Sequence, residues 1–125
     1  MKNQNVVGWF EIYVEDMKRA VHFYSNVFKY GEFMDLSDKN EQMLAFPWVM
    51  NGEFASGALV KAESMKPGKG GTVVYFQSED CEIEATRVTE FGGKVIKPKF
   101  AIGEYGFVVI VEDSEGNLIG IHSKA

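Results

Sequence analysis

The chain has 125 residues, of which 46% are apolar and 14% aromatic, and its formal net charge is −5. This length and composition predict one compact domain with its own core, and the scattered positions of the basic residues argue against a nucleic-acid partner. No apolar run approaches the roughly 20 residues that span a bilayer or forms a signal peptide, and the single cysteine fits a reducing compartment, so we expect a cytoplasmic protein without a membrane partner.

The first half of the chain predicts a strand, a helix and three further strands. Residues 9–14 predict the first strand, and Asp16 is a good helix N-cap because its carboxylate can accept an N–H left free in the first turn. From Met17 to Phe28 the apolar residues recur at the spacing of one helix face, and Gly31 is expected to end the helix. The three strands expected after it are Phe33–Leu36, Gln42–Phe46 and Ala55–Lys61.

The second half repeats this order. Val73–Ser78 predicts a strand, Asp80 is expected to cap a helix over Cys81–Phe91, and two glycines follow that helix. The remaining expected strands are one that starts at Val95 and is interrupted by Pro98, one at Phe107–Val111 and one at Leu118–His122. We therefore predict an α+β domain of two tandem βαβββ modules, the first at about 6–63 and the second at about 72–125, joined by a Lys- and Gly-rich linker at about 64–71.

Several short motifs flank the two expected helices. They are Val14 and Asp16 before the first helix, Phe23-Tyr24 and Val27-Phe28 within it, Glu79-Asp80 and Gly92-Gly93 around the second helix, and the turn from Asp113 to Asn117. In their order and spacing the chain resembles the vicinal oxygen chelate superfamily, which includes glyoxalase I, bleomycin resistance proteins and extradiol dioxygenases. The resemblance covers nearly the whole chain and is closest to small proteins related to lactoylglutathione lyase. It implies a curved mixed sheet around a cleft, usually in a homodimer.

Metal-using members of that superfamily hold the ion with four cleft side chains, typically His and Glu. By the resemblance, these positions fall on Trp9, Val73 and Gly120 and near Gly57. None of these residues offers the side-chain nitrogen or oxygen that a divalent ion of this class needs. We therefore expect no metal site and no cofactor.

Side chains alternate between the two faces of a strand, so each cleft position predicts its neighbours in the cleft. If Trp9 faces the cleft, Glu11 and Tyr13 face it too. In the same way, a cleft-facing Val73 brings Tyr75 and Gln77 into the cleft. A cleft-facing Gly120 brings Leu118 and His122. The ligand-binding residues expected in this way are Trp9, Tyr13, Val73, Tyr75, Gln77 and Gly120, and we add Trp48 of the first module.

Glu11 and His122 are the candidate catalytic residues, because a carboxylate and an imidazole in an enclosed site can do acid–base work or share a displaced metal. The alternative is that neighbouring tyrosines hydrogen-bond Glu11 and that His122 lies at a frayed strand end.

Asn51-Gly52 predicts a turn, and the apolar residues that cluster around it either wall a ligand cavity or belong to the core or a dimer interface. The members of this cluster are Met43, Phe46, Trp48, Met50 and Phe54. Trp9 likewise either stacks on a flat ligand or fills the volume where relatives hold ligand and metal.

These patterns predict a metal-free protein that binds a small organic molecule in an apolar cleft and forms a homodimer. The competing hypothesis is a lyase, isomerase or dioxygenase related to lactoylglutathione lyase that uses relocated cleft residues, either with or without a metal ion. A third hypothesis is a structural or regulatory partner domain with a filled cleft. Fold alone does not choose among them.

Overall fold

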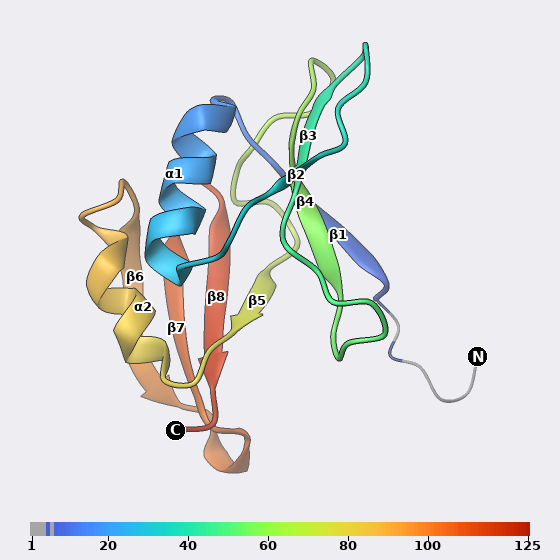
Figure 1. Cartoon of the computed structure of the whole chain (residues 1–125). Helices are drawn as coiled ribbons and strands as arrows, with labels where there is room; N and C mark the ends of the chain where they lie inside the picture. The colour runs from blue at the N-terminus through green and yellow to red at the C-terminus, as the bar shows by residue number, and fades with distance from the viewer. Residues whose placement is uncertain (1–4, 6) are drawn as a thin grey trace.

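The computed structural model describes residues 5 and 7–125 and shows in them two helices and two four-stranded sheets (Figure 1). The first module consists of β1 (Trp9–Tyr13), α1 (Met17–Phe28), β2 (Met34–Asp35), β3 (Gln42–Ala45) and β4 (Ser56–Lys61). The second consists of β5 (Val74–Gln77), α2 (Cys81–Val88), β6 (Lys94–Ala101), a 3-10 turn (Gly103–Tyr105), β7 (Phe107–Glu112) and β8 (Leu118–Ser123). The predicted α+β fold of two βαβββ modules is confirmed.

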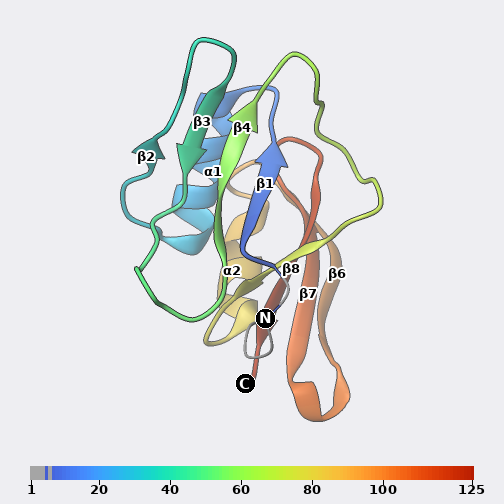
Figure 2. The same ribbon diagram turned by 90° about the vertical axis from the view of Figure 1, so that its right-hand side faces the viewer.

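The two sheets have the same topology. The first has the strand order β1-β4-β3-β2, which Figure 2 shows side by side, and the second has the order β5-β8-β7-β6. In each sheet the first strand of the module pairs in parallel with the last strand, and the other neighbours are antiparallel. The parallel pair requires a crossover, and in each module that crossover begins with the helix.

The first helix forms where its cap and its apolar spacing predict it. Oδ1 of Asp16 accepts a hydrogen bond of 3.0 Å from the backbone N–H of Arg19, and the helix covers Met17–Phe28 as expected. The residue that terminates the helix differs from the prediction, because Lys29, and not Gly31, adopts the left-handed conformation with φ 60°. A left-handed residue just after a helix is usually glycine, so a lysine in this place carries a small backbone cost.

The second helix is three residues shorter than predicted. It ends at Val88, and Phe91 lies in a turn in which the N–H of Gly93 donates to the carbonyl of Val88 at 2.9 Å. Phe91 still packs against the core, so the apolar spacing continues past the helix end.

Pro98 does not interrupt its strand, contrary to the prediction. The strand β6 runs through it from Lys94 to Ala101, with irregular pairing on both sides of Lys97. β6 is an edge strand, where a residue without an N–H donor is tolerated.

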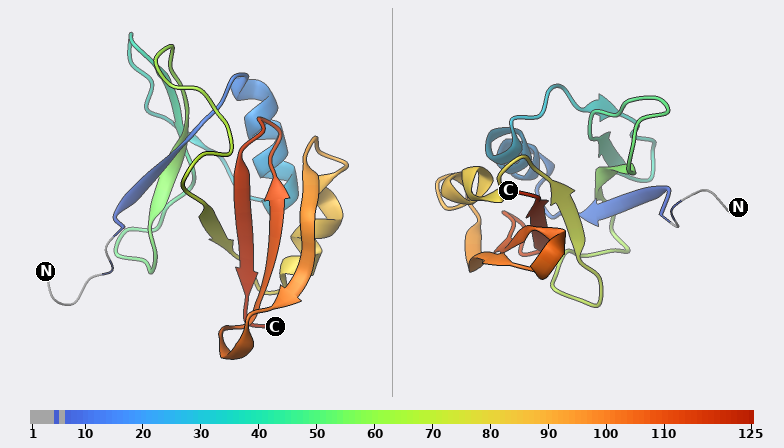
Figure 3. Two further views of the ribbon diagram at one scale, coloured as in Figure 1. Left: turned by 180° about the vertical axis from the view of Figure 1, so that it is seen from behind. Right: turned by 90° about the horizontal axis from the view of Figure 1, so that it is seen from below.

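Both modules share one core. The two helices pack against each other, and a single cluster of buried side chains includes Phe23 and Tyr24 of α1, Phe76 of β5, and Val109 and Ile121 of the second sheet. Each sheet therefore has an inner face toward the helices and an outer face away from them. Figure 3 shows the second sheet from its outer side, with the helices behind it.

The turn after β7 ties the second module to the first. One carboxylate oxygen of Glu115 accepts the backbone N–H groups of Glu15 and Asp16, each at 2.9 Å, and the other accepts Nε of Arg19 at 2.6 Å. Nδ2 of Asn117 donates to the carbonyl of Tyr13 at 2.8 Å. These bonds fix the entry into α1, and we call Glu115, Asn117 and their partners the inter-module clamp.

The pKa values of the two buried carboxylates in this turn shift in opposite directions. Burial raises the pKa of Asp113, although the hydroxyl of Tyr24 donates to it at 2.6 Å. Burial by itself also raises the pKa of Glu115, but the hydrogen bonds from Arg19 and from the backbone of Asp16 outweigh it and hold that pKa below its usual range. Glu115 is therefore a buried, ionised and fully bonded carboxylate.

In the described part of the chain, neither helix is long and apolar enough to cross a membrane.

Candidate functional site

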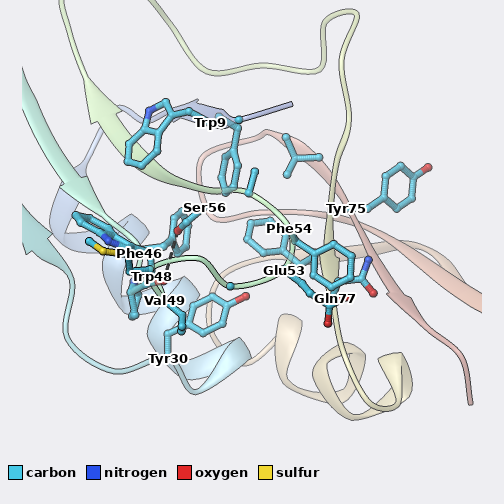
Figure 4. A pocket seen from close by; sticks show the side chains of 18 of the residues that line it. Trp9, Tyr30, Phe46, Trp48, Val49, Glu53, Phe54, Ser56, Tyr75 and Gln77 are labelled. Carbon is cyan, nitrogen blue, oxygen red and sulfur yellow. Dashed lines mark hydrogen bonds between the residues drawn. The ribbon is translucent and has the colours of Figure 1, made fainter. Parts of the chain in front are cut away.

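A cavity of about 580 Å³ opens in the seam between the modules (Figure 4). It is bounded by β1, by the loop 46–55 that joins β3 to β4 together with the first residue of β4, and by β5. Sites for small organic ligands have volumes of about 300–1,000 Å³. The space is therefore of the size that a small organic molecule needs.

Large aromatic side chains form the walls of this cavity. Trp9 and Trp48 meet edge to face, with ring centroids 6.4 Å apart, and both are about two-fifths exposed, at 42% and 43%. In Figure 4 Tyr75 lies on the opposite side from Trp48, and Phe54 lies between them. Aromatic faces left open to solvent at a cavity are costly unless something covers them.

The floor of the cavity belongs to the shared core. Phe46 and Phe76 lie with ring centroids 5.7 Å apart, and Phe10 packs against both. Tyr30 also lines the cavity, and burial, followed by the negative charge of Glu84, raises the pKa of its hydroxyl. The Tyr30 hydroxyl is therefore neutral at ordinary pH.

The loop 47–55 over the cavity has an unusual backbone. Pro47 follows the end of β3, and the N–H of Gly52 donates to the carbonyl of Val49 at 3.0 Å, which confirms the turn expected at Asn51-Gly52. Asn51 and Phe54 both have positive φ, at 61° and 67°. For a bulky residue such as Phe54 this conformation is an outlier, and such strain clusters at ligand sites.

The cavity lining has few polar side chains, and its charge is negative. Among the described residues that line it, Glu53 is the one charged side chain, and there is no Lys, Arg or His. The hydroxyl of Ser56 donates to the carbonyl of Pro47 at 3.4 Å, which leaves its oxygen lone pairs available as acceptors.

Glu11 lies outside this lining, on the outer face of β1. Its carboxylate accepts Nε1 of Trp9 at 3.3 Å and the hydroxyl of Tyr13 at 3.0 Å. Partial burial, followed by the hydrogen bond to Glu11, raises the pKa of the Tyr13 hydroxyl. Strand alternation thus brings Trp9, Glu11 and Tyr13 to one face, and the carboxylate has two donors from its own strand.

His122 lies on the outer face of the second sheet, within β8 and not at a frayed end, since β8 continues to Ser123. Its Nε2 lies 2.7 Å from the carbonyl oxygen of Tyr105, which can only accept, so Nε2 carries a proton. Its Nδ1 lies 3.0 Å from Oε1 of Gln77, which also lines the cavity.

The predicted site residues fall into two groups. Those that line the cavity are Trp9, Trp48, Tyr75 and Gln77, together with Phe46, Met50 and Phe54 of the apolar cluster. Those outside its lining are Glu11, Tyr13, Met43, Val73, Gly120 and His122. No hydrogen bond within the described residues joins Glu11 to His122, and each has other partners.

Sequence reasoning missed Phe10, Tyr30, Glu53 and Phe76 as lining residues. Phe10 and Phe76 are on the inner faces of their strands, and they reach the cavity because it cuts into the seam between the modules. Alternation within a strand carries no signal for such a seam. Glu53 follows the Asn51-Gly52 turn, so its place near an expected cavity wall was the one available clue.

At the four positions expected for metal ligands, no side chain on the outer faces is of a type that usually coordinates a metal ion. Gly57 itself pairs with Phe10 on the inner face, and its neighbours Ser56 and Ala58, which pair with Trp9 and Glu11, are the outer ones. Between residues 7 and 125 no group of three or more His, Cys, Asp or Glu side chains could hold a metal ion.

A sequence profile described as the Glyoxalase/Bleomycin resistance protein/Dioxygenase superfamily matches residues 6–121. A comparison with curated proteins finds no match. Among solved structures, the antibiotic-binding protein TnmS3 from Streptomyces sp. CB03234 is 22% identical, with a TM-score of 0.69 and 100% of both chains covered.

Two further structures have the same fold. A member of the same superfamily from Sphaerobacter thermophilus DSM 20745 is 24% identical, with a TM-score of 0.72 and coverage of 96% of this chain and 98% of that one. Glyoxalase I from Zea mays is 16% identical, with a TM-score of 0.71, and the match covers 94% of this chain and 44% of the maize chain. At these identities the similarity shows the fold alone.

Proposed function

The chain belongs to the Glyoxalase/Bleomycin resistance protein/Dioxygenase superfamily, as its resemblance implied, and we propose that it binds a small organic molecule in the aromatic cavity without a metal ion. The observation that carries this proposal is the cavity itself, whose walls are the exposed faces of Trp9, Trp48 and Phe54. A space of about 580 Å³ supports binding over the alternative of a structural domain whose cleft is filled by side chains. The antibiotic-binding function of TnmS3, which has the same fold, is consistent with it.

The metal-free part of the proposal rests on side-chain chemistry. The expected ligand positions carry an indole, an isopropyl group, a glycine and, beside Gly57, Ser56 or Ala58. An enzyme that pairs Glu11 with His122 has less support, because these residues belong to different sheets and each is hydrogen-bonded elsewhere.

The two tryptophans make this proposal easy to test, because both line the cavity and the chain has no others. Nile red, a neutral apolar dye, is expected to bind one site per chain and to quench tryptophan fluorescence in protein treated with EDTA. Replacing Trp48→Leu should weaken this binding about tenfold, because base-sized aromatic stacking on an indole contributes about 1–3 kcal/mol.

The matched control is Tyr105→Leu, at an exposed aromatic residue outside the cavity, which should bind the dye as the parent does. Equal loss in both variants, or no saturable binding at all, would refute the cavity as the site. Binding that disappears with EDTA and returns with Zn²⁺ would refute its metal-free character.

We also propose that a second copy of the chain covers the outer faces of the sheets. The outer face of the first sheet carries Tyr13 and Met43 over the small residues Ala45, Ala58 and Val60, which form an apolar cluster separate from the main core. A stable dimer buries about 1,600 Å² in total, and two uncovered sheet faces offer apolar surface for it.

A further inference from the structure

We infer that the molecule bound in the aromatic cavity is a flat organic cation, such as an aromatic ammonium or amidinium compound. This inference rests on the proposed binding function and adds the charge of the ligand to it.

The first support is the arrangement of aromatic faces. Trp9, Trp48, Phe54 and Tyr75 come from three separate segments and surround the cavity, as Figure 4 shows. A cation within about 6 Å of the centre of such a ring is attracted to its negative face, most strongly by indole. A flat ligand can contact several of these faces at once.

The second support is the hydrogen bond between Trp9 and Glu11. Nε1 of Trp9 donates to the Glu11 carboxylate at 3.3 Å, so the anion lies at the edge of the indole and leaves its faces free. Hydrogen bonds polarise the groups that they join, so a donor bonded to an anion gains electron density. The Trp9 ring is therefore a better partner for a cation than an unbonded indole.

The third support is the charge of the lining. Glu53 is its charged residue, and the described lining contains no cation that could pair with an anionic ligand. A carboxylate or phosphate in this cavity would lie beside a like charge and meet no cation of the described lining, which opposes its binding. A cation would instead meet the Glu53 carboxylate and the oxygen lone pairs of Ser56.

A series of probes with nearly the same ring system tests the charge directly. The probes are 1-methylquinolinium, quinoline and 1-naphthoate, which at pH 8 carry a positive charge, no charge and a negative charge. Titration calorimetry at 0.15 M salt is expected to show 1-methylquinolinium binding about tenfold more tightly than quinoline. The naphthoate should bind more weakly than quinoline.

A matched pair of variants assigns the preference to the cavity. Glu53→Gln should reduce the affinity for 1-methylquinolinium about threefold or more and leave that for quinoline unchanged, since only the cation interacts with the lost charge. Glu63→Gln removes the same charge from an exposed residue outside the lining and should change neither affinity.

The outcomes separate the two proposals. If quinoline or naphthoate binds as tightly as the cation, or if Glu53→Gln and Glu63→Gln behave alike, the inferred charge is wrong while the binding function stands. If none of the three probes binds while Nile red does, this inference fails and the binding function stands, and if Nile red does not bind either, both fail.

Discussion

Gly120 lies directly beneath the ring of Tyr75 on the outer face of the second sheet. A Cβ atom added at Gly120 would overlap that ring, whereas no backbone atom of another strand stands as close. Gly120 is buried and Tyr75 is 49% exposed, so the tyrosine can swing away from an added methyl group. The absence of a side chain at Gly120 therefore allows the Tyr75 ring to take its position in the cavity wall.

We predict that Gly120→Ala displaces Tyr75, weakens dye binding in the cavity and destabilises the fold by about 1 kcal/mol. In a Tyr75→Ala background the same change should be neutral or slightly stabilising, since alanine is better than glycine in a strand. Urea unfolding of the four proteins in a double-mutant cycle measures this coupling. Additive effects would show that the two residues do not contact.

At this scale the sequence predicted side-chain faces better than side-chain partners. Alternation placed Glu11 and Tyr13 on one face of β1, where a hydrogen bond of 3.0 Å joins them. It could not reveal that His122 contacts the carbonyl of Tyr105, because that contact depends on how the β6–β7 turn folds back.

Among the elements, α1 followed its sequence most closely. The Asp16 cap and the apolar spacing predicted Met17–Phe28 to the residue, because the local cap and the buried face specify the same helix. The second helix was predicted too long, since Phe91 keeps a helix-like spacing although it lies in a turn. Pro98 was wrongly expected to break β6, because the sequence does not show which strand lies at an edge.

The inter-module clamp gives a pH-dependent prediction for Glu115. Its pKa is lower in the folded than in the unfolded chain, so its stabilising effect is complete above about pH 4.3, the ordinary glutamate value, and is lost as the pH falls through the folded value. We expect Glu115→Gln to lower the free energy of unfolding by about 2 kcal/mol at pH 7. The difference from the parent should shrink below pH 4, where a protonated Glu115 resembles glutamine.

Urea unfolding of both proteins at several pH values from 3 to 7 checks this prediction. Asp113, whose pKa is raised by burial, titrates in both proteins, so its effect cancels in the difference. A difference that stays constant across this range would mean that the charge of Glu115 does not contribute.

For the whole molecule, the duplication of the module was visible in the sequence, but the seam between the copies was not. The cavity forms where Phe10 and Phe76, one from each module, approach each other with ring centroids 6.0 Å apart. That distance follows from packing of the two helices and from the clamp, which join residues about 60–100 positions apart in the chain. No local pattern encodes such contacts.

The proposed homodimer is also a prediction for the whole molecule. Tyr13→Lys places a charge on the outer face of the first sheet and should shift a dimer toward monomer in light scattering, because a desolvated charge opposes association. The control Lys39→Glu changes an exposed charge in the β2–β3 turn and should leave the mass unchanged. A parent protein that is monomeric at high concentration would contradict the dimer.

The central claim is that the cavity lined by Trp9 and Trp48 binds a small molecule without a metal ion. These are the two tryptophans of the chain, so a nitrogen–proton correlation spectrum has two indole signals to follow. In protein treated with EDTA, a titration with Nile red, the neutral probe of the binding function, should shift both indole signals together and to saturation. Two indole signals that stay fixed, or that move only after a divalent metal is added back, would contradict the claim.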